Sequence, residues 1–383
     1  MLCIALALLS GCSSDNSPKQ PQAASTTLGS VESPSTSRLA ETTTSTEPTT
    51  ERATLECIAQ LPLPLRVGQL VMTIMPAESI DASRDSIRDA QLGGVLIPRP
   101  NGRLDRRAVI EMRDQSFIPL FVSVDEEGGT VSRLTESVGP LPGASQIGAS
   151  KSPTEAKALV SMHAAKVADL GFNMVFAPVV DVRSASGRGY ITERSFSSDA
   201  QMVAAFGQAY VDGWLSAGIT PVLKHFPGHG LADDTHAGPA VVPPLSELRT
   251  RDLIPYSKIA SGRSDIGVMM SHVRVPGLTG GPSSLSASAY GLLRRDVGFD
   301  GVVITDSLNM GAISKLGNAN PGVLAIAAGA DIALILDMDQ AKSAVELLRK
   351  AVGTDISESR VNESVRRIFA IKGVDACALA RKV

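Results

Sequence analysis

The sequence lacks an excess of basic residues. Its 383 residues contain 36 Lys and Arg against 39 Asp and Glu, so its formal net charge at pH 7 is −3. A chain without a basic stripe or patch has no electrostatic footprint for a polyanion. We therefore expect no nucleic-acid partner.

A long apolar run is also lacking. The apolar stretch at residues 1–9 is about half as long as a membrane-spanning helix needs to be. Small residues follow it, which is typical of an export signal over residues 1–11. The run Leu9-Ser10-Gly11-Cys12 resembles a bacterial lipobox. This resemblance implies diacylglycerol on Cys12 and an exported protein that is lipid-anchored to the outer face of the cell membrane. The alternative is an ordinary signal peptide with an incidental cysteine.

Residues 13–52 contain no large apolar residues at a regular period, and they are rich in Ser, Thr, Pro, Glu and Gln. Such a segment cannot bury enough surface to offset the entropy lost on ordering. We expect residues 12–54 to form a disordered linker that holds a domain away from a membrane. The folded domain is then expected over residues 55–383.

Cysteine is scarce, with four residues in the chain. Cys3 belongs to the expected signal and Cys12 is the expected lipid site, so Cys57 and Cys377 remain at the two ends of the folded part. Two remaining cysteines in an exported protein favour a disulfide. We predict a Cys57–Cys377 bridge, with two isolated thiols as the alternative, and neither spacing indicates a metal site.

Eight short apolar runs recur along the folded part, at residues 67–74, 93–98, 119–124, 174–179, 220–223, 265–270, 301–304 and 331–336. Continuous apolar runs indicate strands that are buried on both faces, as in parallel sheets. Amphipathic stretches lie between them, most clearly at 154–170 and 200–217.

This alternation predicts an α/β protein with a single (β/α)8 TIM-type barrel. An open doubly wound sheet is the alternative, and the first run could instead belong to a helix. No glycine-rich dinucleotide fingerprint follows the first run, which disfavours a nicotinamide-binding sheet.

Polar residues follow several of the apolar runs. In a barrel, the active groups lie at the C-terminal ends of the strands. The residues found at these positions are Asp125, Asp181, Lys224, His225, His272 and Asp306. Acids and bases are thus expected to converge on one rim of the barrel.

The segment after the fifth run is a long loop without its own periodicity, and such loops are usually functional. It contains Asp234-Thr235-His236, in which a carboxylate lies two residues from an imidazole. A carboxylate that is hydrogen-bonded to a histidine fixes its tautomer and raises its basicity, which suits a proton shuttle. Zinc binding is the alternative, but an HExxH spacing is absent.

Five motifs point to one family. KHFPGHG followed by D-x-H resembles the signature of family 3 glycoside hydrolases, in the branch of single-domain β-N-acetylhexosaminidases. The segments VDEEGGTVSRL, RSFSSD, GFDGVVITDSLNMGAI and AIAAGADIALI resemble further elements of that family. They occur in order over nearly the whole folded part.

The resemblance implies a retaining exo-β-N-acetylglucosaminidase. We expect it to act on cell-wall (peptidoglycan) fragments or related glycans, because an exported lipoprotein lies where such fragments are found. We also expect no cofactor or metal, and a monomer. It assigns Asp306 as the nucleophile, His236 as the acid/base and Asp234 as the partner of His236. The residues that match the family's sugar-binding positions are Asp125, Arg133, Arg194, Lys224 and His225.

Several features depart from the family pattern. Three residues separate Gly230 from Asp234 where four are usual, Thr130 replaces a frequent Arg, and Ser307 replaces a common Asp. Aromatic residues are few for an enzyme that would use stacking platforms, with one Trp and four Tyr.

The same residues also allow alternative functions. They are a β-glucosidase, a phosphorylase, a substrate-assisted mechanism using the neighbouring Asp125 and Glu126, and a sugar-binding lipoprotein without activity. Among the other histidines, we expect His229 to support the loop and His163 to be an ordinary helix residue. For His272, structural support and substrate contact are both open.

Overall fold

Eight parallel strands form the centre of the molecule. The computed structural model describes residues 47–383 except 188, 316, 318 and 319. The eight strands are β1 (Val71–Ile74), β2 (Gly94–Leu96), β3 (Phe121–Val124), β6 (Met174–Val175), β7 (Thr220–Phe226), β8 (Gly267–Met270), β9 (Val302–Thr305) and β10 (Ala333–Ile335). Their order in the sheet is β10-β1-β2-β3-β6-β7-β8-β9, and each pair of neighbours is parallel.

The sheet closes between its two ends. A parallel bridge joins Ile304 of β9 to Ile332, next to β10, and the N–H of Thr305 donates to the carbonyl of Ile332 at 3.0 Å. The (β/α)8 barrel predicted from the sequence is therefore confirmed, and the open sheet is excluded. One antiparallel hairpin lies outside the barrel, made of β4 (Glu126–Gly128) and β5 (Val131–Ser132).

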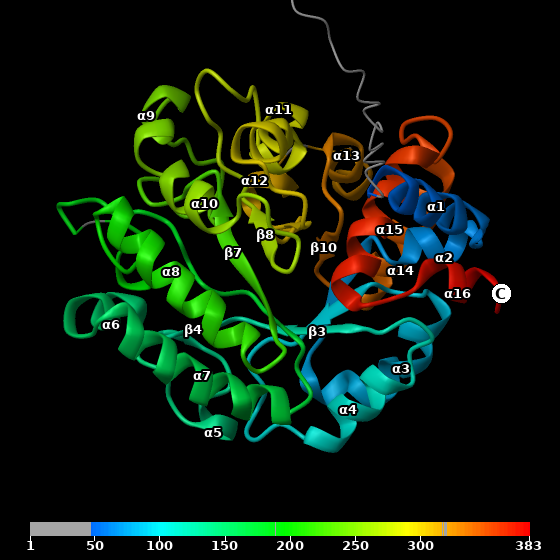
Figure 1. Ribbon diagram of the computed structural model, residues 1–383, viewed down its shortest axis with the longest axis horizontal. Helices are drawn as coiled ribbons and strands as arrows, with labels where there is room; N and C mark the ends of the chain where they lie inside the picture. The colour runs from blue at the N-terminus through cyan, green and yellow to red at the C-terminus, as the bar shows by residue number, and fades with distance from the viewer. Residues whose placement is uncertain (1–46, 188, 316, 318–319) are drawn as a thin grey trace, which may run out of the picture. The chain divides into compact units, whose positions relative to one another are not determined.

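Helices surround the barrel (Figure 1). The α-helices are α1 (Glu47–Gln60), α2 (Leu63–Gly68), α3 (Ile80–Asp89), α4 (Arg106–Asp114), α5 (Thr135–Val138), α6 (Ala144–Ser150), α7 (Pro153–Asp169), α8 (Ala200–Leu215), α9 (Leu245–Thr250), α10 (Leu253–Ile259), α11 (Ala287–Gly291), α12 (Gly311–Ser314), α13 (Pro321–Ala328), α14 (Met338–Ala351), α15 (Glu358–Lys372) and α16 (Ala376–Ala380). The 3-10 helical turns are η1 (Ala77–Ser79), η2 (Thr192–Arg194) and η3 (Ser283–Leu285), and η4 (Leu292–Val297) is a π-helix.

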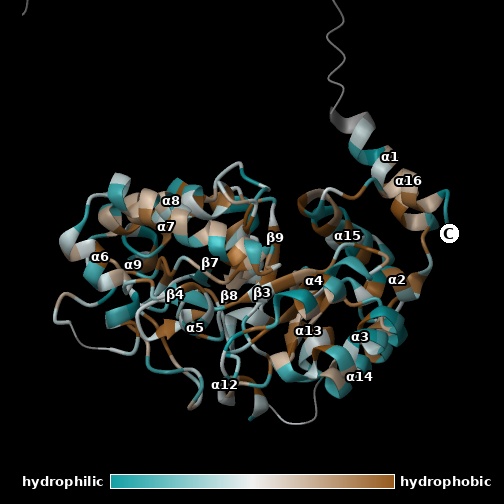
Figure 2. Cartoon of the chain, turned by 90° about the horizontal axis from the view of Figure 1, so that it is seen from below, coloured by the Kyte–Doolittle hydropathy of each residue, from teal (hydrophilic) through white to brown (hydrophobic). Residues whose placement is uncertain are grey.

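The two predicted amphipathic stretches form α7 and α8, which pack against each other. Local signals set where they begin: Ser152 and Glu155 make a capping box with Pro in the first turn of α7, and the Asp199 side chain caps α8. In Figure 2, helices such as α3 and α14 carry many hydrophilic residues, whereas hydrophobic residues are concentrated towards the interior. The core therefore lies within the barrel and between the strands and helices.

The first apolar run is divided between two elements. Residues 67–68 end α2 and the strand begins at Val71. Gly68 makes this arrangement possible, because a Cβ there would overlap the carbonyl oxygen of Ala90. The helix considered for this run and the first strand of the barrel are both present.

Helix α1 corrects the predicted linker boundary. It begins at Glu47, so residues 47–54, expected to be disordered, are helical. Tertiary contacts stabilise a segment that has no strong apolar face: α1 packs on α15 and α16, and Glu51 pairs with Arg366 at 3.2 Å.

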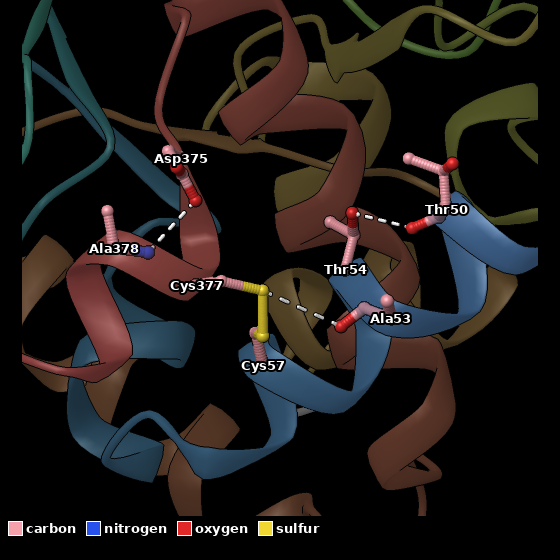
Figure 3. Close-up of a disulfide and its surroundings, with 7 residues drawn as sticks. All are labelled: Thr50, Ala53, Thr54, Cys57, Asp375, Cys377 and Ala378. Carbon is pink, nitrogen blue, oxygen red and sulfur yellow. Dashed lines mark hydrogen bonds between the residues drawn. A yellow bond between two sulfur atoms is a disulfide. The ribbon is translucent and has the colours of Figure 1, made fainter.

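Cys57 and Cys377 are joined by a disulfide, with their Cα atoms 4.9 Å apart (Figure 3).

The expected signal peptide at 1–11, the lipid site Cys12 and linker residues 12–46 lie outside the described residues. Within residues 47–383, apart from the four gaps, no helix is both long and apolar enough to span a bilayer.

Candidate active site

A cavity of about 200 Å³ opens at the C-terminal ends of the strands. Every barrel strand, or the residue that directly follows it, contributes to its wall. The wall residues from the strands, in order from β1 to β10, are Ile74, Leu96, Asp125, Phe176, Lys224, His225, Met269, Asp306 and Leu334. The rim that the sequence predicted to collect acids and bases is therefore the mouth of one cavity.

A cluster of buried charges forms one wall. The Nζ atom of Lys224 lies 2.5 Å from Oδ1 of Asp125 and 2.6 Å from Oε1 of Glu127. Arg194 donates two parallel hydrogen bonds of 2.7 Å to the two oxygens of Glu127. Burial by itself lowers the pKa of Lys224, but the two carboxylates raise it above the usual value. Lys224 therefore stays charged and holds the Asp125 carboxylate in place at the edge of the cavity.

Glu127 was not among the site residues predicted from the sequence. Its side chain is 3% exposed. Burial raises its pKa, but Lys224 and Arg194 outweigh burial and bring the pKa to about 2. An ionised Glu127 fixes both cations and cannot serve as a proton donor at neutral pH. Its place in the VDEEGG segment was visible in the sequence, but no local pattern identified its partners.

Arg133 lines the cavity, as expected, and its environment differs from that of Arg194. Its backbone N–H donates to Glu126 at 2.7 Å. Among the described residues, no carboxylate lies within ion-pair distance of its guanidinium. This guanidinium is therefore available to an acceptor group on a ligand.

Glu126 does not line the cavity. It is fully buried and accepts hydrogen bonds from the hydroxyl of Ser132 at 2.5 Å and from the backbone of Leu134 at 3.0 Å. His163 of α7 lies 3.0 Å from it, so this helix residue is a buried partner of the β4–β5 hairpin. Asp125 and Glu126 therefore do not present a carboxylate pair to a ligand.

Asp181 orders the segment after β7 from beneath. One of its oxygens lies 2.7 Å from Nδ1 of His225, and the other accepts the backbone N–H of His229 at 2.7 Å. Burial raises the pKa of Asp181, but His225 and His229 lower it to below its usual range. With Nδ1 of His225 donating to Asp181, Nε2 lies on the side of Arg194, at 3.4 Å.

His229 lines the cavity and supports the loop that follows it. Its Nε2 lies 3.4 Å from the hydroxyl of the buried Thr235. Burial, with a smaller effect of the nearby His225, lowers the pKa of His229 to about 4. It is therefore neutral at physiological pH.

The Asp234–His236 pair forms on this loop. Oδ1 of Asp234 lies 2.7 Å from Nδ1 of His236 and accepts the backbone N–H of the same residue at 2.9 Å. The carboxylate fixes the tautomer, with the proton on Nδ1, and leaves Nε2 free to exchange a proton. The His236 side chain is 62% exposed, so the imidazole reaches both the cavity and solvent.

Asp306 lies at the end of β9, on the floor of the cavity. Its backbone N–H donates to Met270, and one carboxylate oxygen accepts the N–H of Ser307 at 2.8 Å. Burial raises the pKa of Asp306, but His272, His225, that N–H and Lys224 lower it to below its usual value. The carboxylate is thus ionised at neutral pH.

His272 does not line the cavity. Its Nδ1 lies 2.7 Å from the hydroxyl of Ser284, and its Nε2 lies 2.8 Å from the carbonyl oxygen of Ser307. Both ring nitrogens are therefore occupied. Of the two roles left open by the sequence, the geometry favours support of the segment that carries Asp306.

Tyr190 is a second wall residue that the sequence did not indicate. Its ring lies 5.3 Å from the guanidinium of Arg194 and 6.1 Å from the ring of His236. It is 42% exposed, so it offers an aromatic face at the mouth of the cavity. A lone tyrosine in a loop carries no sequence signal for such a position.

Zinc was an alternative for the histidine-rich loop. Over the part of the chain that the structure describes, no group of three or more His, Cys, Asp or Glu has a geometry that could hold a metal ion. The imidazoles are instead hydrogen-bonded to carboxylate, hydroxyl and carbonyl oxygens.

Comparison with known proteins gives one consistent family. Residues 63–371 match the glycosyl hydrolase family 3 N-terminal domain. The beta-hexosaminidase LpqI of Mycobacterium tuberculosis is 41% identical over 267 residues, which cover 67% of this chain and 69% of that protein. A beta-hexosaminidase of Stenotrophomonas maltophilia is 36% identical over 296 residues, covering 72% and 87%.

Solved structures agree with these relatives. A glycosyl hydrolase of the GH3 family from Mycobacterium smegmatis superposes with a TM-score of 0.76 at 37% identity, covering 82% of this chain and 98% of that one. A family 3 beta-N-acetylglucosaminidase from a Paenibacillus species superposes with a TM-score of 0.77 at 34% identity, covering 83% and 63%.

Proposed function

The chain belongs to glycosyl hydrolase family 3 and is a glycoside hydrolase, and we propose that it releases terminal β-linked N-acetylglucosamine through a covalent glycosyl-enzyme. Relatives named as beta-hexosaminidases and a beta-N-acetylglucosaminidase support the sugar. One observation supports the mechanism most: an ionised carboxylate, Asp306, and an imidazole, His236, line the same cavity.

In the first step, an oxygen of Asp306 attacks the anomeric carbon and the bond from that carbon to the leaving oxygen breaks. In its imidazolium form, His236 gives its Nε2 proton to the leaving oxygen and keeps the proton on Nδ1, so the aglycone departs as a neutral alcohol. The carboxylate is suited to this role because its low pKa keeps it ionised while it lies on the cavity floor. Retaining glycosidases in general use a carboxylate nucleophile of this kind.

In the second step, water replaces the aglycone. His236 takes a proton from water as its oxygen bonds to the anomeric carbon, and the bond to Asp306 breaks, which restores the carboxylate. Asp234 assists both steps, because its contact with Nδ1 stabilises the imidazolium that donates the proton in the first step and is formed again in the second.

The remaining wall provides hydrogen bonds for the sugar. Asp125 accepts bonds from hydroxyl groups, whereas Arg133, Arg194 and Lys224 donate to hydroxyl or acetamido oxygens, and Nε2 of His225 completes the set. Lys224 and Arg194 are held by Glu127 before any ligand binds. Such preorganisation reduces the free energy spent on ordering the site.

Turnover of 4-nitrophenyl N-acetyl-β-glucosaminide tests the function. We expect Asp306→Ala to lose activity by about 10³-fold or more, and His236→Ala to lose about 10²–10⁴-fold. Trapping with a 5-fluoro sugar should label Asp306. An inactive wild type on both this substrate and the β-glucoside would overturn the proposed function, and label on Asp125 would overturn the assignment of the nucleophile.

We also propose that the protein is exported, that Cys12 holds a lipid anchor and that the natural substrates are peptidoglycan fragments or related glycans. The N-terminal sequence supports this, because an apolar run precedes Leu9-Ser10-Gly11-Cys12. Intact mass of membrane-extracted protein should show a diacylglycerol adduct on a chain beginning at Cys12. An unmodified Cys12 in the mature chain would contradict the anchor.

A further inference from the structure

Three consecutive carbonyls of the Asp234–His236 loop are bonded to the segment that follows Asp306. The carbonyl of Thr235 accepts the N–H of Ala312 at 3.2 Å, and that of His236 accepts the N–H of Gly311 at 3.3 Å. The carbonyl of Ala237 accepts Nζ of Lys315 at 3.2 Å. We call the donor segment, residues 311–315, the loop seat.

The loop has few other inward contacts at this point. Both His236 and Ala237 are exposed, and the hydroxyl of the buried Thr235 has one hydrogen-bond partner among the described residues, His229 at 3.4 Å. The bonds between Asp234 and His236 are internal to the loop, so they do not fix it against the barrel. The loop seat therefore sets where the imidazole lies.

Gly311 is the closest point of this contact. A Cβ atom at this position would lie 2.6 Å from the carbonyl oxygen of His236 and 3.2 Å from the carbonyl carbon of Ala237. These are backbone atoms, which cannot turn away as a long side chain could. The backbone of Gly311 is not in the left-handed region, so alanine strains nothing at the position itself and acts only by displacing the loop.

The loop seat also connects the loop that carries His236 to the segment that carries Asp306. Gly311 follows Asp306 by five residues, and Asp306 is fixed to β8 by its N–H bond to Met270. The distance between the carboxylate and the imidazole is therefore set through one short stretch of backbone.

We propose that Gly311 is a positioning residue for the acid/base histidine: its missing side chain lets the loop rest on the seat at the distance that proton transfer needs. This inference depends on the proposed role of His236. Displacement of the imidazole by about 1 Å is enough to cost on the order of 10²-fold in rate.

The loss of activity caused by Gly311→Ala should depend on the leaving group. An aglycone with a high pKa needs the proton from His236, whereas 2,4-dinitrophenolate departs without it. For Gly311→Ala we expect kcat/KM to fall by about 30-fold or more on an alkyl or sugar aglycone, and by less than about 3-fold on the dinitrophenyl substrate. Hydrolysis of the glycosyl-enzyme also needs the base, so azide should accelerate turnover of the dinitrophenyl substrate and yield the glycosyl azide.

The experiment compares wild type, Gly311→Ala, His236→Ala and Gly280→Ala. Gly280 is a matched control, because it is exposed, has an ordinary backbone conformation and has no heavy atom within 4 Å of an added Cβ. Inhibition by N-acetylglucosamine reports the sugar site, and we expect it to change little in Gly311→Ala. If Gly311→Ala does not fold, Lys315→Met, which removes the third donor, should show the same leaving-group dependence.

The outcomes separate the two proposals. Inactive wild type, or His236→Ala without dependence on the leaving group, overturns the role of His236. If His236→Ala behaves as expected while Gly311→Ala matches Gly280→Ala on every substrate, the positioning role is wrong. An equal loss of Gly311→Ala activity on all aglycones, without azide rescue, would also overturn it.

Discussion

Replacement of Glu127 by glutamine removes one buried charge and little volume. In the native protein this carboxylate pairs with both Arg194 and Lys224 at distances of 2.6–2.7 Å. Glutamine keeps one acceptor oxygen but replaces the other with an NH2 donor and carries no charge, so Asp125 is the remaining carboxylate of the cluster for Arg194 and Lys224. We expect Glu127→Gln to lose stability and to bind N-acetylglucosamine more weakly, because Arg194 and Lys224 are no longer fixed.

The pKa gives the magnitude. Folding moves the pKa of Glu127 from 4.5 to about 2, which corresponds to roughly 3 kcal/mol of stability. Because the folded pKa is the lower one, this contribution is complete above pH 4.5 and is lost as the pH falls towards 2. For a domain of this size, the loss at pH 7 lowers Tm by roughly 5 °C.

Thermal unfolding of wild type and Glu127→Gln at pH 7 and again near pH 3 tests this. The difference in Tm should be large at pH 7 and should shrink at the lower pH, where the unfolded state is already protonated. Glu136→Gln is the control, because Glu136 is an exposed glutamate on α5. Equal Tm values for Glu127→Gln and wild type at pH 7, with equal affinity for the sugar, would refute the reasoning.

Three further predictions concern Asp181, His229 and the disulfide. Asp181→Asn should lower kcat/KM by about 10-fold or more, because its single acceptor oxygen cannot serve both Nδ1 of His225 and the N–H of His229; a wild-type value would contradict this. His229 has a folded pKa of about 4, below its ordinary 6.5, so its burial should cost stability as pH falls through that interval. His229→Asn should flatten the dependence of Tm on pH between 6.5 and 4, and an unchanged slope would exclude this origin. Removing the Cys57–Cys377 bridge by a double serine substitution should lower the free energy of unfolding by about 2–5 kcal/mol, because the bridge closes a loop of 320 residues. The same substitution should leave kcat unchanged, because no residue of α1 or α16 lines the cavity.

Much of the fold could be predicted from the sequence because its signals are local. Each of the eight apolar runs contains a strand or its flank, since a strand covered on both faces must be apolar along its length. Helix α8 begins at the predicted residue, because the Asp199 cap lies next to it in the chain. The expected boundary of the linker at residue 54 differs from the structure, in which α1 begins at Glu47, because this helix depends on packing against the far end of the chain.

The family and the identity of the candidate reacting groups were also available from the sequence. The motifs around His236 and Asp306 are contiguous, so their residue types and spacing are visible without a structure. A motif does not show which charges its residues meet. Glu126 and Glu127 are neighbours in one motif. Glu126 is bonded to Ser132 and His163 outside the cavity, whereas Glu127 pairs with two cations in the cavity wall.

Only the tertiary structure decided how these residues act on one another. Arg194 and Glu127 are 67 residues apart, and Lys224 and Asp125 are 99 apart, yet closure of the parallel barrel brings each pair into contact. The sequence by itself determined a barrel of a known family with an acid and a base at its rim. The burial of Glu127 and the seat of the His236 loop on Gly311 follow from contacts between segments that are distant in the chain, and no local pattern encodes them.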